Sequence, residues 1–174
     1  MKTKFIPVNT PLLGGNELEY VTDCIKTGWI SSEGSYVPRF ESAVAEKVNR
    51  KYGVAVSNGT AAIDIAISAL KISKGDEIIL PTHTIISCIS HIVRSGITPV
   101  LVDSDSKTWN MDVSQIEAKI TNKTKAIMAV HLYGLPVEID KIMSLAKKVP
   151  AGVVDLMTLD EIGWTIVRPK LTAK

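Results

Sequence analysis

The stretch VSNGTAAIDIAISAL, residues 56–70, joins the end of an apolar segment to the start of an amphipathic one. We predict a short strand at Gly53–Ser57 and a helix at Thr60–Leu70. A strand that passes into a helix through Ser-Asn-Gly-Thr leaves backbone N–H groups without partners at the helix start, where the helix dipole adds positive potential. The turn is therefore a candidate anion site, and an N-capped helix without a ligand is the alternative.

Predicted strands and helices alternate downstream of this turn. The expected strands are Glu77–Leu80, Thr98–Val102, Thr124–Val130 and Gly152–Val154, and the expected helices are Ile85–Arg94, Asp112–Ile120 and Glu138–Lys148. Upstream we expect two helices, the first capped by Asn16 and ended by Gly28, the second running from Pro38 to about Arg50. Because the strands are apolar throughout, the pattern predicts an α/β fold with a mainly parallel sheet and helices on both faces.

Composition and charge exclude several classes of function. Hydrophobic residues make up 45% and charged residues 22% of the 174 residues, and the net charge is +2. This balance gives no reason to expect nucleic acid or a membrane as a partner. The N-terminus does not have the pattern of a signal peptide, and Cys24 and Cys88 lack metal-ligand spacing, so we expect reduced thiols and a cytoplasmic protein.

Polar clusters follow four of the predicted strands, where parallel sheets bind their ligands. These clusters are SNGT, PTHT, VDSD and HLYG. Asp103 and Asp105 in the third cluster form a weak metal signal, since two carboxylates alone are common, and we expect a strand-end turn and no metal site. His91 lies within an apolar helical pattern and is expected to be structural.

An ordered set of segments resembles the DegT/DnrJ/EryC1/StrS family of pyridoxal-phosphate-dependent nucleotide-sugar aminotransferases. The segments are TGWISSEGSYVPRFE, VSNGTAA, GDEIILPTHTIIS, PVLVDSDSKTWNMD, ITNKTKAIMAVHLYG and DKIMSLAKK. The resemblance covers roughly residues 6–148 and is greatest to the perosamine-synthase branch, which transfers an amino group from glutamate to C4 of GDP-4-keto-6-deoxymannose for lipopolysaccharide O-antigen. It implies an incomplete large domain of the type I aminotransferase fold, pyridoxal 5'-phosphate as cofactor, nucleotide sugar and glutamate as partners, and a homodimer.

The resemblance also implies which residues bind the cofactor. Gly59 and Thr60 would donate backbone N–H groups to its phosphate, with the Thr60 hydroxyl adding another donor and Asn58 shaping the turn. Ile85 takes the position where many relatives stack an aromatic residue on the pyridine ring; isoleucine can cover that ring but cannot stack on it. His83 lies nearby, as either a ligand or a polar loop residue.

The substrate side of the site is expected to include an early loop and one strand end. Trp29, Ser31 and Ser32 resemble a segment that lines the substrate pocket, and a solvated loop is the alternative. His131, followed by Tyr133 in AVHLYG, is a candidate contact to cofactor or substrate. The alternative for His131 is a strand-end hydrogen bond.

The last part of the chain departs from the family pattern. Relatives carry a motif like V-I-E-D-A-A-E, with the aspartate that binds the pyridinium nitrogen, and a later F-S-F-x-x-x-K segment with the Schiff-base lysine. Here GVVDLMTLDEIG places Leu156 at the aspartate position and Asp155 one residue earlier, a shift that reverses the face of a strand. No F-S-F-x-x-x-K segment is present, and Lys170 and Lys174 lack its context.

We therefore expect residues 1–148 to be the aminotransferase part and residues 149–174 to be a divergent tail, which a frameshift would explain. Without its lysine and aspartate motifs the chain is expected to be inactive alone and to form no covalent bond to the cofactor. A non-catalytic module that binds a sugar nucleotide or a protein is one alternative, and a degenerate product without function is another. The sequence does not specify which nucleotide sugar the ancestral enzyme used.

Overall fold

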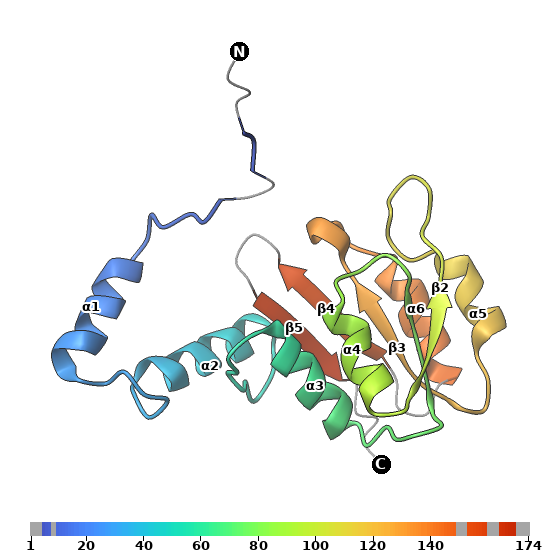
Figure 1. The fold of residues 1–174 in the computed structure, drawn as a ribbon, viewed down its shortest axis with the longest axis horizontal. Coiled ribbons are helices and arrows are strands. Elements are labelled where there is room, and N and C mark those ends of the chain that lie inside the picture. The colour runs from blue at the N-terminus through green and yellow to red at the C-terminus, as the bar shows by residue number, and fades with distance from the viewer. Residues whose placement is uncertain (1–4, 8–9, 149–152, 160–163, 170–174) are drawn as a thin grey trace. The chain divides into compact units, whose positions relative to one another are not determined.

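The computed structural model describes residues 5–7, 10–148, 153–159 and 164–169, with side chains described to residue 147. The chain divides into two compact units, Met1–Ser57 and Asn58–Lys174, and each is described by itself (Figure 1). Among the described helices, none has the length and apolar character needed to cross a membrane.

The first unit contains two helices, α1 (Glu17–Thr27) and α2 (Tyr36–Lys47). Helix α1 ends as predicted at Gly28, whose left-handed backbone (φ 78°) lets its N–H bond to the Ile25 carbonyl. The side chain of Asn16 makes no capping hydrogen bond, so the predicted cap is wrong in that detail. Helix α2 begins two residues before Pro38, because proline is tolerated throughout the first helical turn, where its missing N–H is not needed.

The predicted strand at Gly53–Ser57 is wrong, since this segment forms no strand. The Ala55 N–H donates to the Glu41 side-chain carboxylate at 2.8 Å, in place of a neighbouring strand's carbonyl. A Cβ added to Gly53 would lie 2.5 Å from the Glu41 carbonyl oxygen, so the segment passes very close to α2. Apolar composition indicates burial or pairing, but a strand forms only where a second strand offers its hydrogen bonds.

The second unit is built on one five-stranded sheet in the order β2-β1-β3-β4-β5. Its strands are β1 (Glu77–Pro81), β2 (Thr98–Val102), β3 (Thr124–Val130), β4 (Val153–Leu159) and β5 (Trp164–Pro169). The first four are parallel, which confirms the predicted parallel sheet. Strand β4 is longer than the predicted Gly152–Val154, whose first residue lies outside the described residues. Strand β5 was not predicted and returns antiparallel along β4.

The helices of this unit follow the predicted order; α3 begins and ends one residue earlier than predicted, and the other three are shorter. They are α3 (Gly59–Ala69), α4 (Ser87–Arg94), α5 (Ile116–Lys119) and α6 (Ile139–Leu145). The 3-10 turns η1 (Val113–Gln115) and η3 (Ala146–Lys148) take up parts of the last two predicted helices, and η2 (Leu132–Gly134) follows β3. Asp112 caps η1 by accepting from the Ser114 N–H, so the predicted start is correct although the helix is shorter.

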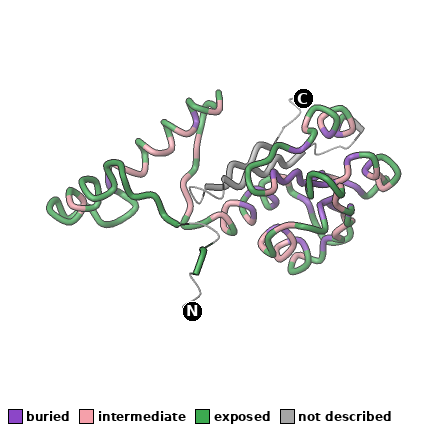
Figure 2. The backbone as a smooth tube through the Cα atoms, turned by 90° about the horizontal axis from the view of Figure 1, so that it is seen from above, coloured by how far each residue is buried: buried purple, intermediate pink, exposed green. Residues whose placement is uncertain are grey.

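Two apolar cores cover the two faces of the sheet. Alternate strand residues such as Ile78 and Met128 pack with α3 and α4, whereas Ile79 and Ile127 face the core that includes Ile116. Buried positions therefore include nearly all residues of β1 and β3, and the buried colour in Figure 2 gathers in the second unit. This arrangement confirms the predicted α/β fold with helices on both faces.

Candidate functional site

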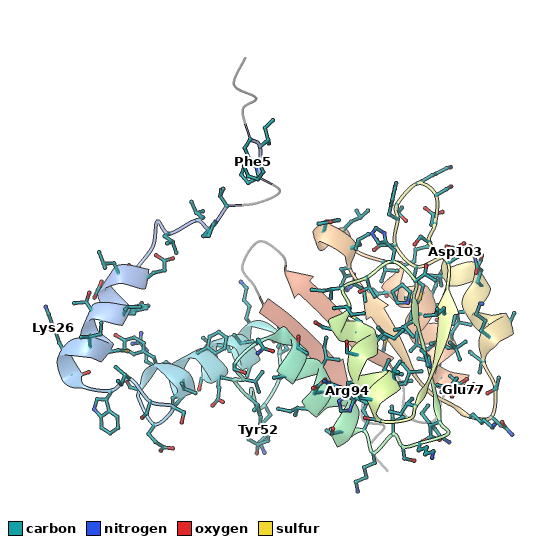
Figure 3. All side chains as sticks on the ribbon, viewed as in Figure 1. Phe5, Lys26, Tyr52, Glu77, Arg94 and Asp103 are labelled. Atoms are coloured by element: carbon teal, nitrogen blue, oxygen red, sulfur yellow. The ribbon has the colours of Figure 1, made fainter. Side chains whose placement is uncertain are left out.

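The polar clusters that follow β1, β2 and β3 lie at the same end of the sheet. Strands β1, β2 and β3 run parallel, so the loops that follow Pro81, Val102 and Val130 leave the same edge. Figure 3 labels Asp103, just after β2, and Glu77, at the start of β1, at opposite ends of the sheet. The candidate site is built from the loops on the Asp103 side together with the start of α3.

The start of α3 forms a capped turn with two exposed donors. The Asn58 backbone is extended (φ −166°, ψ 171°), and its side-chain oxygen accepts from the Ala61 N–H at 2.9 Å. The N–H groups of Gly59 and Thr60, the first two residues of the helix, have no partner among the described residues. The positive end of an eleven-residue helix thus presents two unused donors.

A second helix start lies against this turn. The hydroxyls of Thr60 and Ser87 are 2.8 Å apart, and Ser87 is the first residue of α4. The two hydroxyls share one of their two hydrogens, which leaves the other free to donate to a ligand. Ser87 is not among the predicted site residues, because only the fold brings it beside residue 60. Its one signal in the sequence is a serine near the start of a predicted helix.

Ile85 lies in the loop between β1 and α4 with 56% of its surface exposed. A hydrogen bond between the Thr84 hydroxyl and the Cys88 thiol, which are 3.2 Å apart, joins this loop to α4. Burial raises the pKa of the Cys88 thiol, so this cysteine is a packed thiol rather than a reactive one. The Ile85 side chain is therefore available to cover the face of a ligand near the α4 start.

His131 is buried at the end of β3, where its Nδ1 accepts from the Val137 N–H at 3.0 Å. This bond places the ring proton of the neutral form on Nε2. Buried Asn110 ties down the same loop, accepting from the Leu132 N–H and donating to the Leu135 carbonyl, each at 3.0 Å. The strand-end hydrogen bond is thus present at His131, and its predicted contact to cofactor or substrate stays a prediction.

A hollow of about 450 Å³ opens beside these loops. Its lining residues come from the loops that follow β1, β2 and β3. They are His83, Thr108, Trp109, Leu132, Tyr133 and Leu135. The ring centres of His83 and Trp109 are 5.7 Å apart with the planes tilted by 60°. Sequence analysis had singled out His83 and Tyr133 but not the Trp109 side chain.

The two carboxylates after β2 are engaged in turns. Asp105 accepts from the N–H groups of Lys107 and Thr108 and from the Thr108 hydroxyl. These bonds lower the pKa of the Asp105 carboxyl. Asp103 accepts from the Ser104 N–H. The described part of the chain contains no group of three or more His, Cys, Asp or Glu side chains that could hold a metal ion.

His91 joins α4 to α3, in line with the expected structural role. Its Nδ1 lies 3.3 Å from the Asp64 Oδ1, and its Nε2 is 3.2 Å from the Ser95 hydroxyl. Arg94 pairs with the other Asp64 oxygen at 3.2 Å.

The three remaining predicted site residues lie in the first unit. Trp29, Ser31 and Ser32 belong to the loop between α1 and α2, and Trp29 is 56% exposed. The Ser31 hydroxyl accepts from the Glu33 N–H at 3.4 Å within this loop. Their predicted substrate contact stays a prediction.

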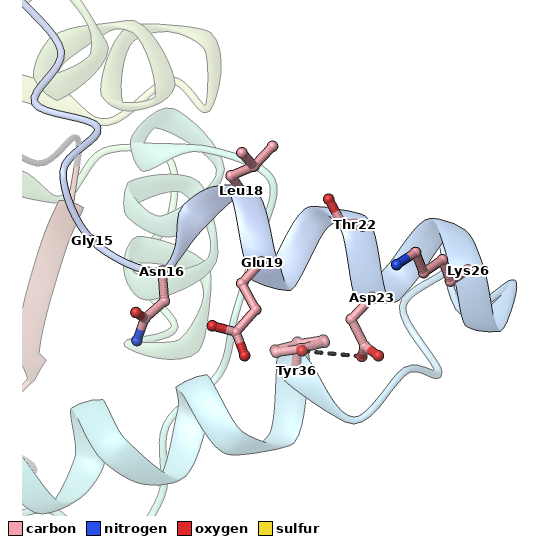
Figure 4. Close-up of a pocket in the computed structure, with 8 residues that line it drawn as sticks. All are labelled: Gly15, Asn16, Leu18, Glu19, Thr22, Asp23, Lys26 and Tyr36. Atoms are coloured by element: carbon pink, nitrogen blue, oxygen red, sulfur yellow. Dashed lines mark hydrogen bonds between the residues drawn. The ribbon is translucent and has the colours of Figure 1, made fainter.

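The first unit also has a groove of about 670 Å³ along α1 (Figure 4). In it the Tyr36 hydroxyl donates to the Asp23 carboxylate at 3.1 Å. Partial burial and this bond raise the pKa of Tyr36. The guanidinium of Arg39 lies over the rings of Tyr20 and Tyr36, so the groove is organised by contacts between the two helices. None of the predicted site residues lines it.

Comparison with known proteins agrees with this geometry. The model of the DegT/DnrJ/EryC1/StrS aminotransferase family matches residues 11–155. The GDP-perosamine synthase of Escherichia coli O157:H7 is 54% identical over 144 residues, which are 83% of this chain and 40% of that protein. The chain therefore spans about 40% of the length of this curated relative.

Solved structures show the same fold in aminotransferases. An aminotransferase from Psychrobacter cryohalolentis superposes with a TM-score of 0.73 at 38% identity, covering 84% of this chain and 38% of that one. NtdA from Bacillus subtilis, with bound PMP cofactor, gives a TM-score of 0.73 at 33% identity over 79% of this chain and 32% of that one. Pyridoxal phosphate is the cofactor expected by family. The chain belongs to the DegT/DnrJ/EryC1/StrS aminotransferase family.

Proposed function

We propose that this chain is the amino-terminal part of an aminotransferase that converts a GDP-linked 4-keto-6-deoxy sugar to its 4-amino sugar, with glutamate as amino donor. The 54% identity to a GDP-perosamine synthase supports this substrate class. We assign the reaction to O-antigen biosynthesis in the cytoplasm and the complete enzyme to a homodimer. Trp29, Ser31, Ser32 and His131 remain the candidate substrate contacts.

The observation that carries the proposal is the anion site at the start of α3. The residues present fit a phosphate: two unpartnered N–H groups, one hydroxyl hydrogen from the Thr60–Ser87 pair and a helix dipole converge there. Asn58 keeps the turn open by capping α3, and Ile85 would cover the cofactor ring. When bound, pyridoxal phosphate supplies an electron sink for the transfer of the amino group.

The chain does not match the two family motifs that carry the aspartate for the pyridinium nitrogen and the Schiff-base lysine. Strand β4 places Asp155 beside Ala129 and Leu156 beside Val130, and the family match ends at residue 155. The chain carries no F-S-F-x-x-x-K segment. We propose that residues 149–174 are a divergent tail and that the chain alone binds phosphate without catalysing transfer. The phosphate site without the lysine motif also favours the second candidate function, a non-catalytic sugar-nucleotide module.

Binding of pyridoxal phosphate tests the anion site. The chain should bind pyridoxal phosphate more tightly than pyridoxal, which lacks the phosphate, in calorimetric titrations. Thr60→Ala should weaken this binding by about 1 kcal/mol, because one neutral hydrogen bond is lost. Ser68→Ala is the matched control: it removes a hydroxyl of the same helix that bonds only to the Asp64 carbonyl. Equal affinity for the two ligands, or an unchanged Thr60→Ala variant, would contradict the site.

Borohydride reduction tests the proposed lack of catalysis. After mixing with pyridoxal phosphate and reduction, mass spectrometry should find no adduct, or only scattered labelling of surface lysines. A single specific adduct on one lysine would show that a catalytic lysine exists, and Lys170 is the first to examine. Coding DNA that holds the aspartate and lysine motifs in another reading frame would support a frameshift as the origin of the tail.

A further inference from the structure

The hollow of about 450 Å³ presents three aromatic side chains to solvent. Trp109 is 61% and Tyr133 72% exposed, and His83 is exposed as well. Both Trp109 (φ 63°) and Tyr133 (φ 49°) adopt a left-handed backbone, which is unfavourable for large residues. Such strain persists only where the surrounding structure enforces it, and it concentrates at binding and catalytic sites.

Hydrogen bonds within the loops that line the hollow hold its walls in place. Asn110 binds the chain at both Leu132 and Leu135, so it fixes the loop that carries Tyr133. Asp105 holds Thr108 through both the backbone N–H and the hydroxyl, which fixes the loop that carries Trp109. A ligand entering the hollow would therefore meet rings whose backbones are already ordered, and little entropy would be lost on binding.

The chemistry of the hollow suits a flat, uncharged ring system. No Asp, Glu, Lys or Arg side chain lines it, so it has no fixed charge for a phosphate, and no α-helix begins at its lining as α3 does at the phosphate site. The His83 ring nitrogens, the Trp109 indole N–H and the Tyr133 hydroxyl have no hydrogen-bond partner among the described residues. A volume of about 450 Å³ with apolar walls and a few polar groups is typical of small-molecule sites.

We propose that this hollow binds the base of a nucleotide, which rests on the proposed nucleotide-sugar function. A purine presents π faces to the aromatic rings and hydrogen-bonding edges to the polar groups of His83 and Tyr133. A pyranose would present only C–H groups to these rings, whereas a purine presents a π face. His83 lies four residues before Ser87, so the base site and the phosphate site share one loop.

Calorimetric titration with GDP, inorganic diphosphate and free mannose tests the proposal. GDP should bind, and diphosphate and mannose should bind at least about 10-fold more weakly, since stacking on the base carries the affinity. Trp109→Asn and Tyr133→Asn each remove a ring while keeping a residue that tolerates the left-handed backbone. Each variant should weaken GDP about 10-fold. Trp109→Phe should keep most of the affinity.

Matched controls distinguish a failure of the nucleotide-base site from a failure of the proposed aminotransferase function. Tyr52→Leu removes an exposed aromatic side chain of the first unit and should leave GDP affinity unchanged. Pyridoxal phosphate binding should be the same in the chain and in its Trp109→Asn variant, which also shows that the variant is folded. Loss of pyridoxal phosphate binding with ring-dependent GDP binding intact would count against the proposed function alone. No GDP binding, GDP affinity indifferent to both ring removals, or mannose binding that depends on Trp109 would overturn the base site.

Discussion

At the scale of single residues, Gly53 shows how a missing side chain sets the path of the chain. A Cβ added at residue 53 would lie only 2.5 Å from the Glu41 carbonyl oxygen. Gly53→Ala should therefore lower the free energy of unfolding by about 1–3 kcal/mol, because backbone must move to admit the methyl group. Urea unfolding of the variant would measure this loss.

Gly14→Ala provides the matched control for that experiment. A Cβ at Gly14 has no heavy atom within 4 Å, and its backbone is not left-handed. This variant should unfold at nearly the same urea concentration as the parent chain. Equal stability of the two alanine variants would show that the chain moves away from α2 at little cost.

Single residues also mark the limit of what the sequence could predict at the site. The helix cap at Asn58 could be predicted, because the Asn58 side chain bonds to the Ala61 N–H only three residues away. The partner of Thr60 could not, because Ser87 lies 27 positions along the chain and meets it only through the packing of α4 on α3. Trp109 was not predicted either. Nothing near it in the sequence indicates that its neighbour Asn110 is buried and orders the loop after β3 through Leu132 and Leu135.

At the scale of elements, the loop between β2 and η1 should respond to pH. Hydrogen bonds from Thr108 and Lys107 lower the pKa of Asp105, and those from Ser114 and Gln115 lower the pKa of Asp112. A carboxyl whose pKa is lowered by folding stabilises the fold above its unfolded value, about 3.9 for aspartate. This stabilisation is lost as pH falls through the lowered folded value.

Asp105→Asn should therefore be less stable than the parent chain at about pH 6 and closer to it at about pH 3. Urea midpoints at the two pH values would measure the difference. Asp140→Asn is the control, because the Asp140 carboxylate accepts no hydrogen bond from the described residues. A constant difference between the Asp105→Asn variant and the parent at both pH values would contradict the role of the turn.

The strands that were predicted correctly are those whose whole pattern, an apolar run with turn residues on both sides, lies within a short stretch of sequence. Strands β1, β2 and β3 are apolar runs bounded by turns, and they were found within a residue of their predicted ends. Residues 53–57 have a similar composition but no strand beside them, so composition alone gave the wrong answer there. Strand β5 was missed because its pairing with β4 depends on a chain reversal that no turn motif in the sequence marks.

At the scale of the whole molecule, burial is unequal between the two units. Ala45 is the only described buried apolar residue of the first unit, whereas strands β1 and β3 of the second unit are buried on both faces. We predict that amide hydrogens of β1 and β3 exchange slowest and that those of α1 exchange fastest among the helices. Hydrogen exchange followed by mass spectrometry would measure both. Equal protection of α1 and β3 would mean that α1 is covered in solution, as by a second copy of the chain.

The antiparallel return of β5 along β4 has a consequence for how the molecule is made. Only residues 160–163 separate these strands, whereas β1 reaches its neighbour β2 through the whole of residues 82–97. Closing a short loop costs less entropy, and hairpins form within microseconds. The β4–β5 pair can therefore form without any crossover, whereas the pairing of β1 with β2 requires the chain to pass first through α4.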